Sequence, residues 1–313
     1  MKALVCGIGG QDGAYLAQHL LNKGYEVIGS SRDAMATSFV NLDCLGIKDR
    51  IIRISMAIND FRSILGAIIR FKPDEIYNLA GQSSVGLSFE QPVETMDSIV
   101  GGTLNLLEAI RFSQREIRFY NAGSTECFGD TGEHAANEES AFSPRSPYAV
   151  AKSAAYWLVR NYRESYGLFA CTGILSNHES PLRPERFVTQ KIISAARRIS
   201  AGSDEMLRLG NIDIVRDWGW APDYVEAMHR MLNIEKPDDF VIATGRSVSL
   251  EYFISRVFSN FGLSFEDHVV IDRSLLRPSD IKTGHISPAK ANKILLWRHS
   301  IDVDLVIDRM CSV

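Results

Sequence analysis

The stretch that decides the fold lies near the start of the chain and reads Lys2-Ala-Leu-Val-Cys6 followed by Gly7-Ile-Gly-Gly10-Gln-Asp-Gly13. The first five residues form an apolar run typical of a buried strand, and the pattern after the glycines predicts a helix to about Lys23. Glycines spaced three apart let the backbone approach a pyrophosphate, whose charge then lies at the helix amino terminus. Glycine turns also serve tight strand-to-helix packing, but this placement between a strand and a helix favours a dinucleotide site.

The rest of the first half alternates short apolar runs with helical patterns, which is typical of a parallel sheet covered by helices on both faces. We expect an α/β fold of the Rossmann type, in which a doubly wound parallel sheet carries a smaller mixed α/β lobe that binds the substrate. Further strands are expected at Tyr25–Ser30, Ile51–Ile54, Glu75–Leu79, Ile117–Asn121 and Phe169–Leu175, with long helices near Thr95–Phe112 and after Pro147.

This alternation loosens after about Asn177. Helical patterns at Val188–Ala201, Tyr224–Ile234 and Leu250–Phe261 mix with short strands such as Phe240–Thr244. No linker rich in Pro, Gly or Ser separates the two halves, so we expect them to share an interface. The predicted division is a Rossmann domain over residues 1–176, with a strand and helix of about 211–243 interleaved, and a lobe formed mainly by residues 177–313.

The composition argues against several classes of protein. The 313 residues carry a net charge of −4 without long runs of like charge, so nothing directs the chain to nucleic acid or to a membrane surface. No apolar stretch reaches the roughly 20 residues that span a bilayer, and the first apolar run is too short for a signal peptide. The five cysteines are scattered and form no CxxC pair, so we expect no metal site, no disulfide framework and a cytoplasmic location.

The end of the second predicted strand indicates which dinucleotide is bound. It reads Ile28-Gly-Ser-Ser-Arg32-Asp33, without a carboxylate at the strand tip. An acidic residue at this place binds the ribose 2′-hydroxyl of NAD, whereas an arginine accommodates the 2′-phosphate of NADP. Arg32 therefore favours NADP, and the neighbouring Asp33 keeps NAD as the less favoured alternative.

A second group of residues carries the signs of proton-transfer chemistry. Tyr148 and Lys152 stand four apart at the start of a predicted helix, so their side chains share one face. We expect the ammonium to favour the phenolate and to lower the pKa of Tyr148 toward working pH. The preceding strand runs into Ser124 and Glu126, which should point into the ligand crevice. A hydroxyl at Ser124 can bind the substrate hydroxyl, and abstraction of a second proton needs a carboxylate such as Glu126.

With these motifs the sequence resembles the GDP-mannose 4,6-dehydratase family, a branch of the extended short-chain dehydrogenases. The resemblance runs from residue 1 to about residue 300. Two stretches, Asn177-His-Glu-Ser-Pro181 and Arg216-Asp-Trp-Gly219, are specific to this branch. The others are Gly7–Gly13, Tyr77–Ser83, Arg145–Lys152, Asn161–Gly167, Gly173–Ser176, Phe187–Ile192 and Leu209–Asp213.

This resemblance implies an internal redox cycle that uses NADP and a nucleotide-activated sugar, with GDP-mannose as the first candidate. Tyr148 would take the proton of the C4 hydroxyl while hydride leaves for the cofactor, and Glu126 would take the C5 hydrogen. Ser124 and Glu126 would help to expel the C6 hydroxyl as water. Hydride would then return to C6 and give a 4-keto-6-deoxy sugar. Ser124, Glu126, Tyr148 and Lys152 are thus the catalytic residues that the resemblance implies.

It also implies two sets of binding residues and an assembly. The cofactor would be bound by Gly7, Gly10, Gln11, Asp12, Gly13, Arg32, Leu79, Ala80, Tyr148, Lys152, His178 and Arg183. The GDP-sugar would be bound by Ser83, Ser124, Glu126, Asn177, Val188, Lys191, Arg216, Arg277 and Asp280. The basic members suit a diphosphate, which prefers arginine forks. Members of this branch pair through the long helices that flank the sheet, so we expect a homodimer or a homotetramer.

The sequence departs from the family pattern around the expected substrate. Ser124 stands for a threonine, Gln190 for an arginine, Asp280 for a glutamate and Lys282 for an acidic residue. These changes keep open a related GDP-sugar, such as a GDP-heptose, as the substrate. A 4-keto-sugar reductase or epimerase on the same scaffold is a second alternative. An inactive NADP-binding regulator is a third, disfavoured because the four catalytic positions are intact.

Overall fold

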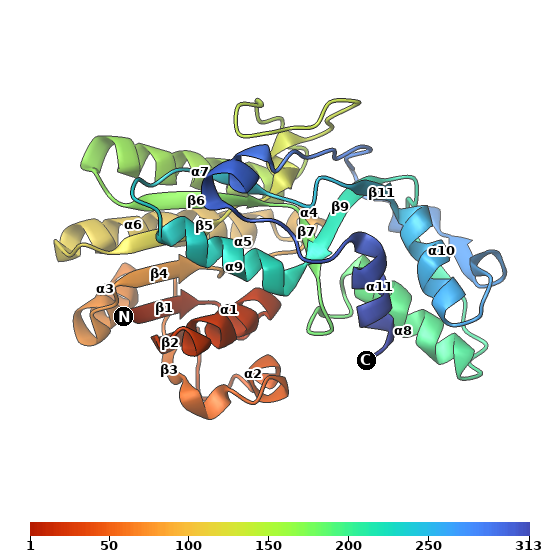
Figure 1. The fold of residues 1–313 in the computed structure, drawn as a ribbon, viewed down its shortest axis with the longest axis horizontal. Helices are drawn as coiled ribbons and strands as arrows, with labels where there is room; N and C mark the ends of the chain where they lie inside the picture. Colours follow the sequence, from red (N-terminus) through yellow and green to blue (C-terminus); the bar gives the residue numbers. More distant parts are fainter.

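A computed structural model describes residues 1–313, and its centre is a sheet of seven strands in the order β10-β6-β5-β4-β1-β2-β3 (Figure 1). All neighbours in this sheet are parallel, which confirms the predicted α/β fold of the Rossmann type. The strands are β1 (Lys2–Cys6), β2 (Glu26–Ser31), β3 (Ile52–Ser55), β4 (Glu75–Asn78), β5 (Arg118–Ala122), β6 (Ala170–Leu175) and β10 (Phe240–Ile242).

Helices cover both faces of this sheet, as a parallel sheet requires. One face packs against α1 (Gln11–Asn22), α2 (Val40–Cys44) and α9 (Ala221–Leu232), and the other against α3 (Phe61–Phe71), α6 (Gly102–Ser113) and α7 (Pro147–Tyr166). Helix α7 has clear sequence signals at both ends. Ser146 caps it by accepting from the Ala149 amide, Pro147 occupies its first turn, and Gly167 ends it in the left-handed conformation.

The long helix predicted near Thr95–Phe112 is interrupted. It consists of α5 (Pro92–Met96), a π-helical turn η2 (Asp97–Gly101) and α6, and it follows the short helix α4 (Val85–Glu90). A π-helical turn needs an i to i+5 hydrogen bond, which leaves no periodic signature in the sequence. Short 3-10 turns complete this half at η1 (Lys48–Arg50) and η3 (Thr125–Phe128).

The smaller lobe has a hydrophobic core of its own, formed by residues such as Ile193, Trp218, Phe253 and Ile307. It holds a three-stranded sheet in the order β11-β9-β7 and a two-stranded sheet of β12 and β8. Its strands are β7 (Asn177–Glu179), β8 (Leu207–Leu209), β9 (Val215–Trp220), β11 (Ser247–Ser249) and β12 (Val269–Ile271). Its helices and short turns are α8 (Val188–Ser200), α10 (Leu250–Asn260), η4 (Phe265–Asp267), η5 (Arg273–Leu275) and α11 (Val303–Cys311). The π-helical turn η6 (Ala291–Leu295) instead packs against α9 and β10 of the large sheet.

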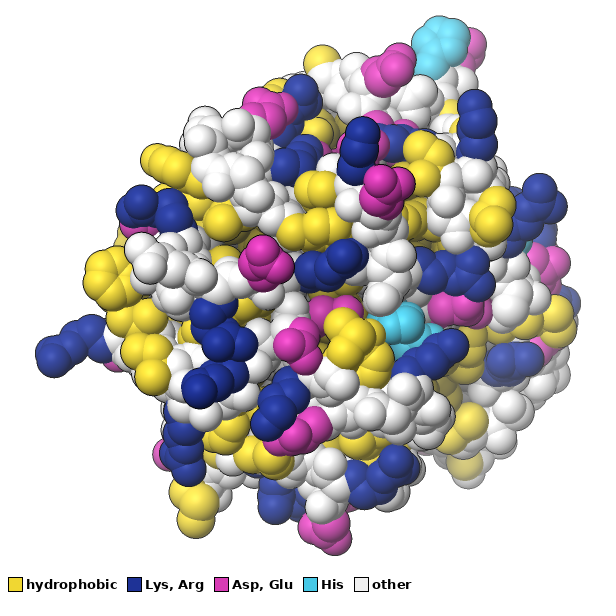
Figure 2. Space-filling model, turned by 60° about the vertical axis from the view of Figure 1, so that its left-hand side comes forward, with side chains coloured by type: hydrophobic (Ala, Val, Ile, Leu, Met, Phe, Trp, Pro, Cys, Tyr) yellow, Lys and Arg dark blue, Asp and Glu magenta, His cyan; other side chains and the backbone are white.

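The surface carries both signs of charge in alternation. Figure 2 shows one face on which Lys and Arg side chains lie next to Asp and Glu, with hydrophobic side chains between them. No helix combines the length and the apolar character that crossing a membrane would need.

β4 is the central strand of the seven and β1 lies beside it. From β1 the chain adds β2 and β3 on one side, and from β4 it adds β5 and β6 on the other, so the strand order reverses between β1 and β4. Loops that follow the strands on the two sides of such a reversal diverge, and the crevice between them is where ligands of this fold class bind. The glycine stretch follows β1, the predicted Leu79 and Ala80 follow β4, and Ser124 and Glu126 follow β5. The predicted site residues of three strands therefore meet at one edge of the sheet.

Candidate active site

The glycine loop after β1 is packed so closely that only glycines fit at two of its positions. Gly7 has a φ of +82°, and a Cβ atom on it would lie 2.9 Å from the Leu79 carbonyl oxygen and 3.0 Å from the Ala80 nitrogen. A Cβ atom on Gly13 would overlap the Gly7 carbonyl oxygen and lie 2.7 Å from the Ile8 Cα. The start of α1 thus lies directly against the loop, and the loop lies directly against the segment that follows β4, which fits a pyrophosphate bound by backbone amides.

Two side chains of this loop fasten it to the strand β7. Gln11 is buried, and its Nε2 donates to the His178 carbonyl oxygen at 3.1 Å, while the Ser180 hydroxyl donates to its Oε1 at 2.7 Å. The Asp12 carboxylate lies 2.9 Å from His178 Nε2. Gln11 was predicted to bind the cofactor, but its side chain does not line the cleft and is satisfied by the protein.

Asp12 and His178 favour the charged form of each other, so their pKa values shift in opposite directions. Burial opposes the Asp12 charge, but the charge of His178 and its hydrogen bond together lower the pKa of Asp12 to about 2. Burial likewise disfavours a charged His178, and the charge and hydrogen bond of Asp12 outweigh it, so the pKa of His178 is raised. The imidazole also stacks on Tyr224, with ring centroids 4.3 Å apart. Both residues line the cleft in a fixed orientation.

Tyr148 and Lys152 lie on one face of α7 and both line the cleft, as their spacing predicts. The Lys152 ammonium donates to the Ala122 carbonyl oxygen at 2.7 Å and lies 5.7 Å from the Tyr148 ring centroid. Burial lowers the pKa of Lys152 to about 8. Burial also raises the pKa of Tyr148, and a hydrogen bond from Ser124 offsets only part of this. We predicted that Lys152 lowers the pKa of Tyr148. This prediction is wrong for the protein without bound ligands, because burial of the phenol disfavours its charged form and raises the pKa.

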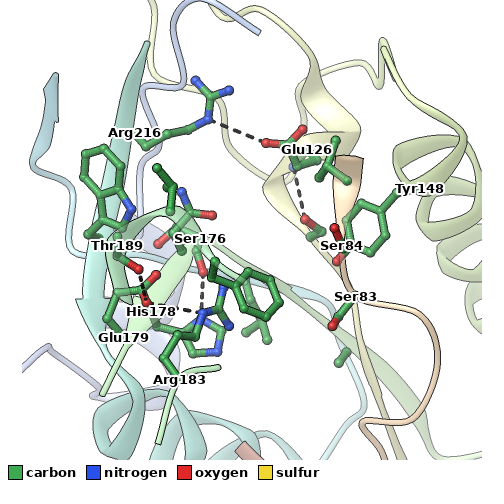
Figure 3. A pocket seen from close by; sticks show the side chains of 18 of the residues that line it. Ser83, Ser84, Glu126, Tyr148, Ser176, His178, Glu179, Arg183, Thr189 and Arg216 are labelled. Carbon is green, nitrogen blue, oxygen red and sulfur yellow. Dashed lines mark hydrogen bonds and ion pairs between the residues drawn. The ribbon is translucent and has the colours of Figure 1, made fainter. Parts of the chain in front are cut away.

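Ser124 and Glu126 stand at the turn that follows β5. The Ser124 hydroxyl caps the turn η3 by accepting from the Glu126 amide at 3.3 Å. Glu126 lines the same cleft as Tyr148, so the carboxylate and the phenol can reach one ligand. In Figure 3 these two side chains lie on one wall of the cleft, and His178, Glu179 and Arg183 lie on the other. Glu126 Oε1 lies 3.5 Å from Nε of Arg216, a buried residue of β9.

Several residues of the opposite wall were not predicted. The buried Glu179 carboxylate accepts from the Thr189 hydroxyl at 2.7 Å and lies 3.2 Å from Arg183 Nε. The Arg183 guanidinium also lies 3.7 Å from the centre of the Phe187 ring, and Arg186 lines the cleft beside it. Glu179 and Phe187 belong to motifs of the family resemblance, and only their burial against Arg183 marks them as parts of the site.

The cleft therefore brings together most of the predicted site residues. Its lining includes Asp12, Leu79, Ser83, Ser124, Glu126, Tyr148, Lys152, Asn177, His178, Arg183, Val188, Arg216 and Arg277. The predicted residues outside its lining are Gly7, Gly10, Gln11, Gly13, Arg32, Ala80, Lys191 and Asp280.

Three of the residues outside the lining need separate comment. Lys191 is directed away, and its ammonium donates to the Arg208 carbonyl oxygen at 2.7 Å. Asp280 lies behind Arg216, with its Oδ1 3.4 Å from Arg216 Nη2. Arg32 follows β2 at the surface.

Comparisons with known proteins agree with this geometry. A family model described as GDP-mannose 4,6 dehydratase matches residues 4–310. GDP-mannose 4,6 dehydratase 2 of Arabidopsis thaliana is 44% identical over 318 residues, which cover 98% of this chain and 85% of that protein. GDP-mannose 4,6-dehydratase of Yersinia enterocolitica is 40% identical over 345 residues, covering 99% of this chain and 92% of that protein.

Solved structures share the fold over the whole chain. A UDP-glucose 4-epimerase of Thermus thermophilus in complex with NAD superposes with a TM-score of 0.85 at 25% identity, covering 99% of both chains. A dTDP-glucose 4,6-dehydratase of Streptomyces venezuelae superposes with a TM-score of 0.88 at 20% identity, covering 100% of this chain and 96% of the other. These structures show the shared fold. The family match over residues 4–310 and the relatives that are 40% and 44% identical establish that the chain belongs to the GDP-mannose 4,6-dehydratase family.

Proposed function

We propose that the protein is a hydro-lyase that converts GDP-mannose to GDP-4-keto-6-deoxymannose. One observation carries the proposal: Ser124, Glu126, Tyr148 and Lys152 line a single cleft beside the glycine loop, in a chain 40–44% identical to relatives named for this reaction. A plain dehydrogenase needs a tyrosine and a lysine, whereas an elimination needs a further base, and Glu126 is the carboxylate within reach.

Each residue of the cluster has a distinct task in this reaction. A nicotinamide dinucleotide, held by the glycine loop, would accept a hydride from C4 of the sugar and return it to C6. Tyr148 takes the C4 hydroxyl proton. The positive charge of Lys152 stabilises the Tyr148 phenolate, and its ammonium would bind the ribose of the cofactor. The C4 ketone makes the C5 hydrogen acidic, and Glu126 removes it. Ser124 binds the reacting oxygen, and Glu126 gives its proton to the C6 hydroxyl, which leaves as water. When hydride returns to C6, C5 takes up the proton held by Tyr148, so both side chains return to their starting states and the sum is loss of one water.

The cofactor is proposed to be NADP. Arg32 is exposed at the end of β2 without an ion-pair partner, so its guanidinium is free for a 2′-phosphate. The Asp33 carboxylate, which would otherwise compete for a ribose hydroxyl, accepts from the Met35 and Ala36 amides at 2.9 and 3.1 Å. Arg32→Ala is expected to weaken NADPH binding at least tenfold and to leave NADH binding nearly unchanged, as measured by fluorescence titration. An equal loss for both dinucleotides would contradict the assignment.

The substrate would lie across the cleft from the glycine loop, with the smaller lobe of residues 177–313 closing over it. Arg216 and Arg277 line the cleft and would bind the diphosphate, and Ser83, Asn177 and Val188 would contact the sugar and nucleoside. Lys191 and Asp280 do not line the cleft, and we propose that Asp280 acts by holding Arg216 and Arg277 in place, whereas Lys191 contacts at most the outer end of the nucleotide.

The decisive experiment incubates the purified protein with GDP-mannose and a panel of other nucleotide sugars, without added cofactor. A 4-keto product, detected by its absorbance in alkali, is expected with GDP-mannose, because the redox cycle is closed. Glu126→Gln should abolish this product and spare cofactor binding. Product from a GDP-heptose alone would change the substrate and keep the reaction class. A product that forms only with added reductant, or an epimer, would favour the reductase or epimerase alternative.

We further propose that two copies pair through the helices on the α7 side. Val93 and Met96 of α5, Leu104 of α6 and Val150 and Trp157 of α7 are all exposed apolar side chains. They recur at helical spacing on adjoining helices, a self-complementary apolar face that a second copy would bury. Trp157→Glu is expected to give a monomer in analytical ultracentrifugation at a concentration where the parent protein is a dimer. If Trp157→Glu keeps the oligomeric state of the parent protein, the interface does not include this face.

A cytoplasmic location is part of the same proposal. All five cysteines are free thiols, as proteins of a reducing compartment usually have.

A further inference from the structure

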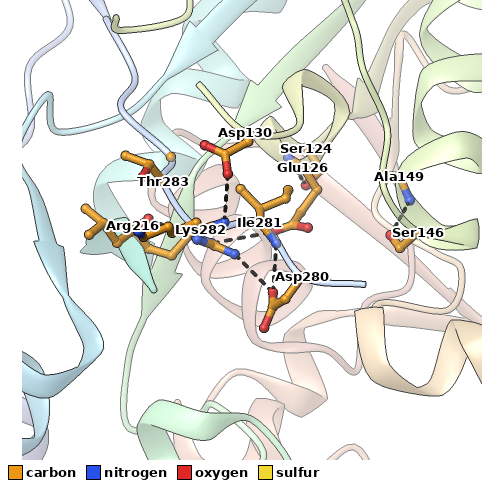
Figure 4. Close-up of polar contacts among 12 residues, drawn as sticks. Ser124, Glu126, Asp130, Ser146, Ala149, Arg216, Asp280, Ile281, Lys282 and Thr283 are labelled. Atoms are coloured by element: carbon orange, nitrogen blue, oxygen red, sulfur yellow. Dashed lines mark hydrogen bonds and ion pairs between the residues drawn. The ribbon is translucent and has the colours of Figure 1, made fainter. Parts of the chain in front are cut away.

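Four charged side chains form a chain of ion pairs that begins at Glu126. Arg216 Nε lies 3.5 Å from Glu126 Oε1, Arg216 Nη2 lies 3.4 Å from Asp280 Oδ1, and Arg277 Nη1 lies 3.6 Å from the same oxygen (Figures 3 and 4). Two cations balance two carboxylates, so this ion-pair chain of Glu126, Arg216, Asp280 and Arg277 carries no net charge. Its first member, Glu126, is the proposed base. The strength of this base therefore depends on whether Arg216 is paired with it.

The far end of the ion-pair chain is fixed by backbone contacts. Arg216 is 9% exposed and its Nη1 donates to the Val215 carbonyl oxygen at 3.0 Å. Asp280 accepts from the Ile281 amide at 3.0 Å, and the Val215 amide donates to the Lys282 carbonyl oxygen at 2.8 Å, which ties this segment to β9. In Figure 4 the Arg216 guanidinium contacts Glu126 and Asp280 at the same time. Asp280 therefore stays with Arg216 whatever happens at Glu126.

Both carboxylate contacts of Arg216 are long, at 3.5 Å to Glu126 and 3.4 Å to Asp280. Each exceeds the 2.7–3.2 Å of an ordinary N–H···O hydrogen bond, so neither holds the guanidinium tightly. The buried pair of Arg163 and Asp239, by contrast, closes to 2.6 Å. Arg216 divides its charge among two carboxylates and a carbonyl oxygen, so the Glu126 contact can be given up without leaving the guanidinium unpaired.

An arriving nucleotide sugar competes for this cation. Its diphosphate carries two negative charges and prefers arginine forks. Arg216 and Arg277 line the cleft, whereas Asp280 does not, so on the cleft side Arg216 would exchange Glu126 for the diphosphate. We propose that Arg216 gates the base: it holds Glu126 in the empty cleft and transfers to the substrate's diphosphate on binding. The inference rests on the proposed function, in which Glu126 removes the C5 hydrogen.

Such a transfer makes the base stronger when it is needed. A carboxylate that loses a neighbouring cation and gains neighbouring phosphates binds a proton more tightly. The charge of Glu126 reaches Tyr148 and Cys127, whose pKa values are raised chiefly by burial and further by this charge. Lys152 and Arg183 line the same cleft, but the cation that forms an ion pair with Glu126 is Arg216, so its departure changes the charge that Glu126 faces. Asp280 acts through Arg216 and is a positioning residue.

The test measures protons taken up when guanosine diphosphate binds, by calorimetry in two buffers with different heats of ionisation. A tenfold rise in the proton affinity of one carboxylate gives an uptake of about half a proton at the most favourable pH, which is found by repeating the measurement at several pH values. Glu126→Gln should lack this uptake and still bind the nucleotide. The difference between the two proteins cancels the titration of the phosphate itself. Asp272→Asn, which removes the comparable but exposed pair of Asp272 and Arg208, serves as control and should behave like the parent.

Equal uptake by the parent protein and Glu126→Gln would overturn the gate, and so would failure of the nucleotide to bind. If Glu126→Gln does not fold, the parent alone still decides. The acid limb of kcat, which reports the substrate complex, should then lie at higher pH than the acid limb of kcat/KM, which reports the free enzyme. Coincident limbs would overturn the gate. If the protein dehydrates GDP-mannose but takes up no proton on binding guanosine diphosphate, the gate is wrong and the proposed function stands. If it takes up the proton but does not dehydrate GDP-mannose, the proposed function is wrong and the exchange at Arg216 stands.

Discussion

Replacement of Gly13 by alanine tests the link between the packing of the glycine loop and cofactor binding. A Cβ atom there would lie 2.7 Å from the Ile8 Cα and 2.9 Å from the Ile8 carbonyl carbon, and closer still to the Gly7 carbonyl oxygen. Ordinary contact begins near 3.4 Å, so the start of α1 must move by about 0.7 Å or more. All three atoms belong to the backbone, so no side-chain rotation relieves the overlap.

Overpacking of this kind costs about 1–3 kcal/mol. If the loop relieves it by moving, the amides that bind the pyrophosphate are displaced, and the affinity for NADPH falls about 5- to 150-fold. Fluorescence titration with NADPH measures the affinity, and urea denaturation measures the free energy of unfolding.

Gly66→Ala is the matched control for this prediction. Gly66 lies within α3, where a Cβ atom would meet nothing within 4 Å. This change should raise the free energy of unfolding by about 0.5–1 kcal/mol and leave NADPH affinity unchanged. Parent-like NADPH affinity in Gly13→Ala would refute the reasoning, because the loop would then tolerate a side chain where the structure has no space.

Two other predictions concern stability. Asp239→Ala leaves the Arg163 guanidinium, bonded to Asp239 at 2.6 and 3.0 Å, without its buried partner, and should lower the free energy of unfolding by about 3–5 kcal/mol; the same change at the exposed Asp43 should cost under about 1 kcal/mol in urea denaturation. The raised pKa of His178 makes its contribution complete below pH 6.5 and lost as the pH rises through the folded-state value. The lowered pKa of Asp12 makes its contribution complete above pH 3.8 and lost as the pH falls toward about 2. The difference in the free energy of unfolding between the parent and His178→Gln should therefore be largest between pH 3.8 and 6.5. A difference that does not change with pH would contradict this.

Local patterns predicted the parts of the site that are local. The glycine spacing places Gly7 in the turn after β1 and Gly13 in the first turn of α1, against that turn. The four-residue spacing places Tyr148 and Lys152 on one face of α7. The fold class followed from the alternation of apolar runs, because both faces of a parallel sheet are buried.

Contacts between distant segments could not be predicted in this way. Nothing in the spacing of Glu126 and Arg216, 90 residues apart, indicates that they pair, since the pairing depends on how β9 lies against the turn after β5. The pKa of Tyr148 was predicted from one neighbour, whereas burial by the whole cleft determines its direction. Gln11 was assigned to the cofactor from its motif, and only the position of β7 reveals that its amide is used within the protein.

The seventh strand of the sheet comes from far along the chain, and this has a consequence for how the protein can be made. β10 pairs with β6, and Asp239 just before it accepts from the Thr172 amide. During synthesis β6 has an open edge until Ile242 has left the ribosome, and such an edge invites association with other chains. A fragment that stops at residue 176 would keep that edge for good and aggregate. Chimaeras between relatives should therefore exchange residues 221–243, which hold α9 and β10, together with the nucleotide-binding half.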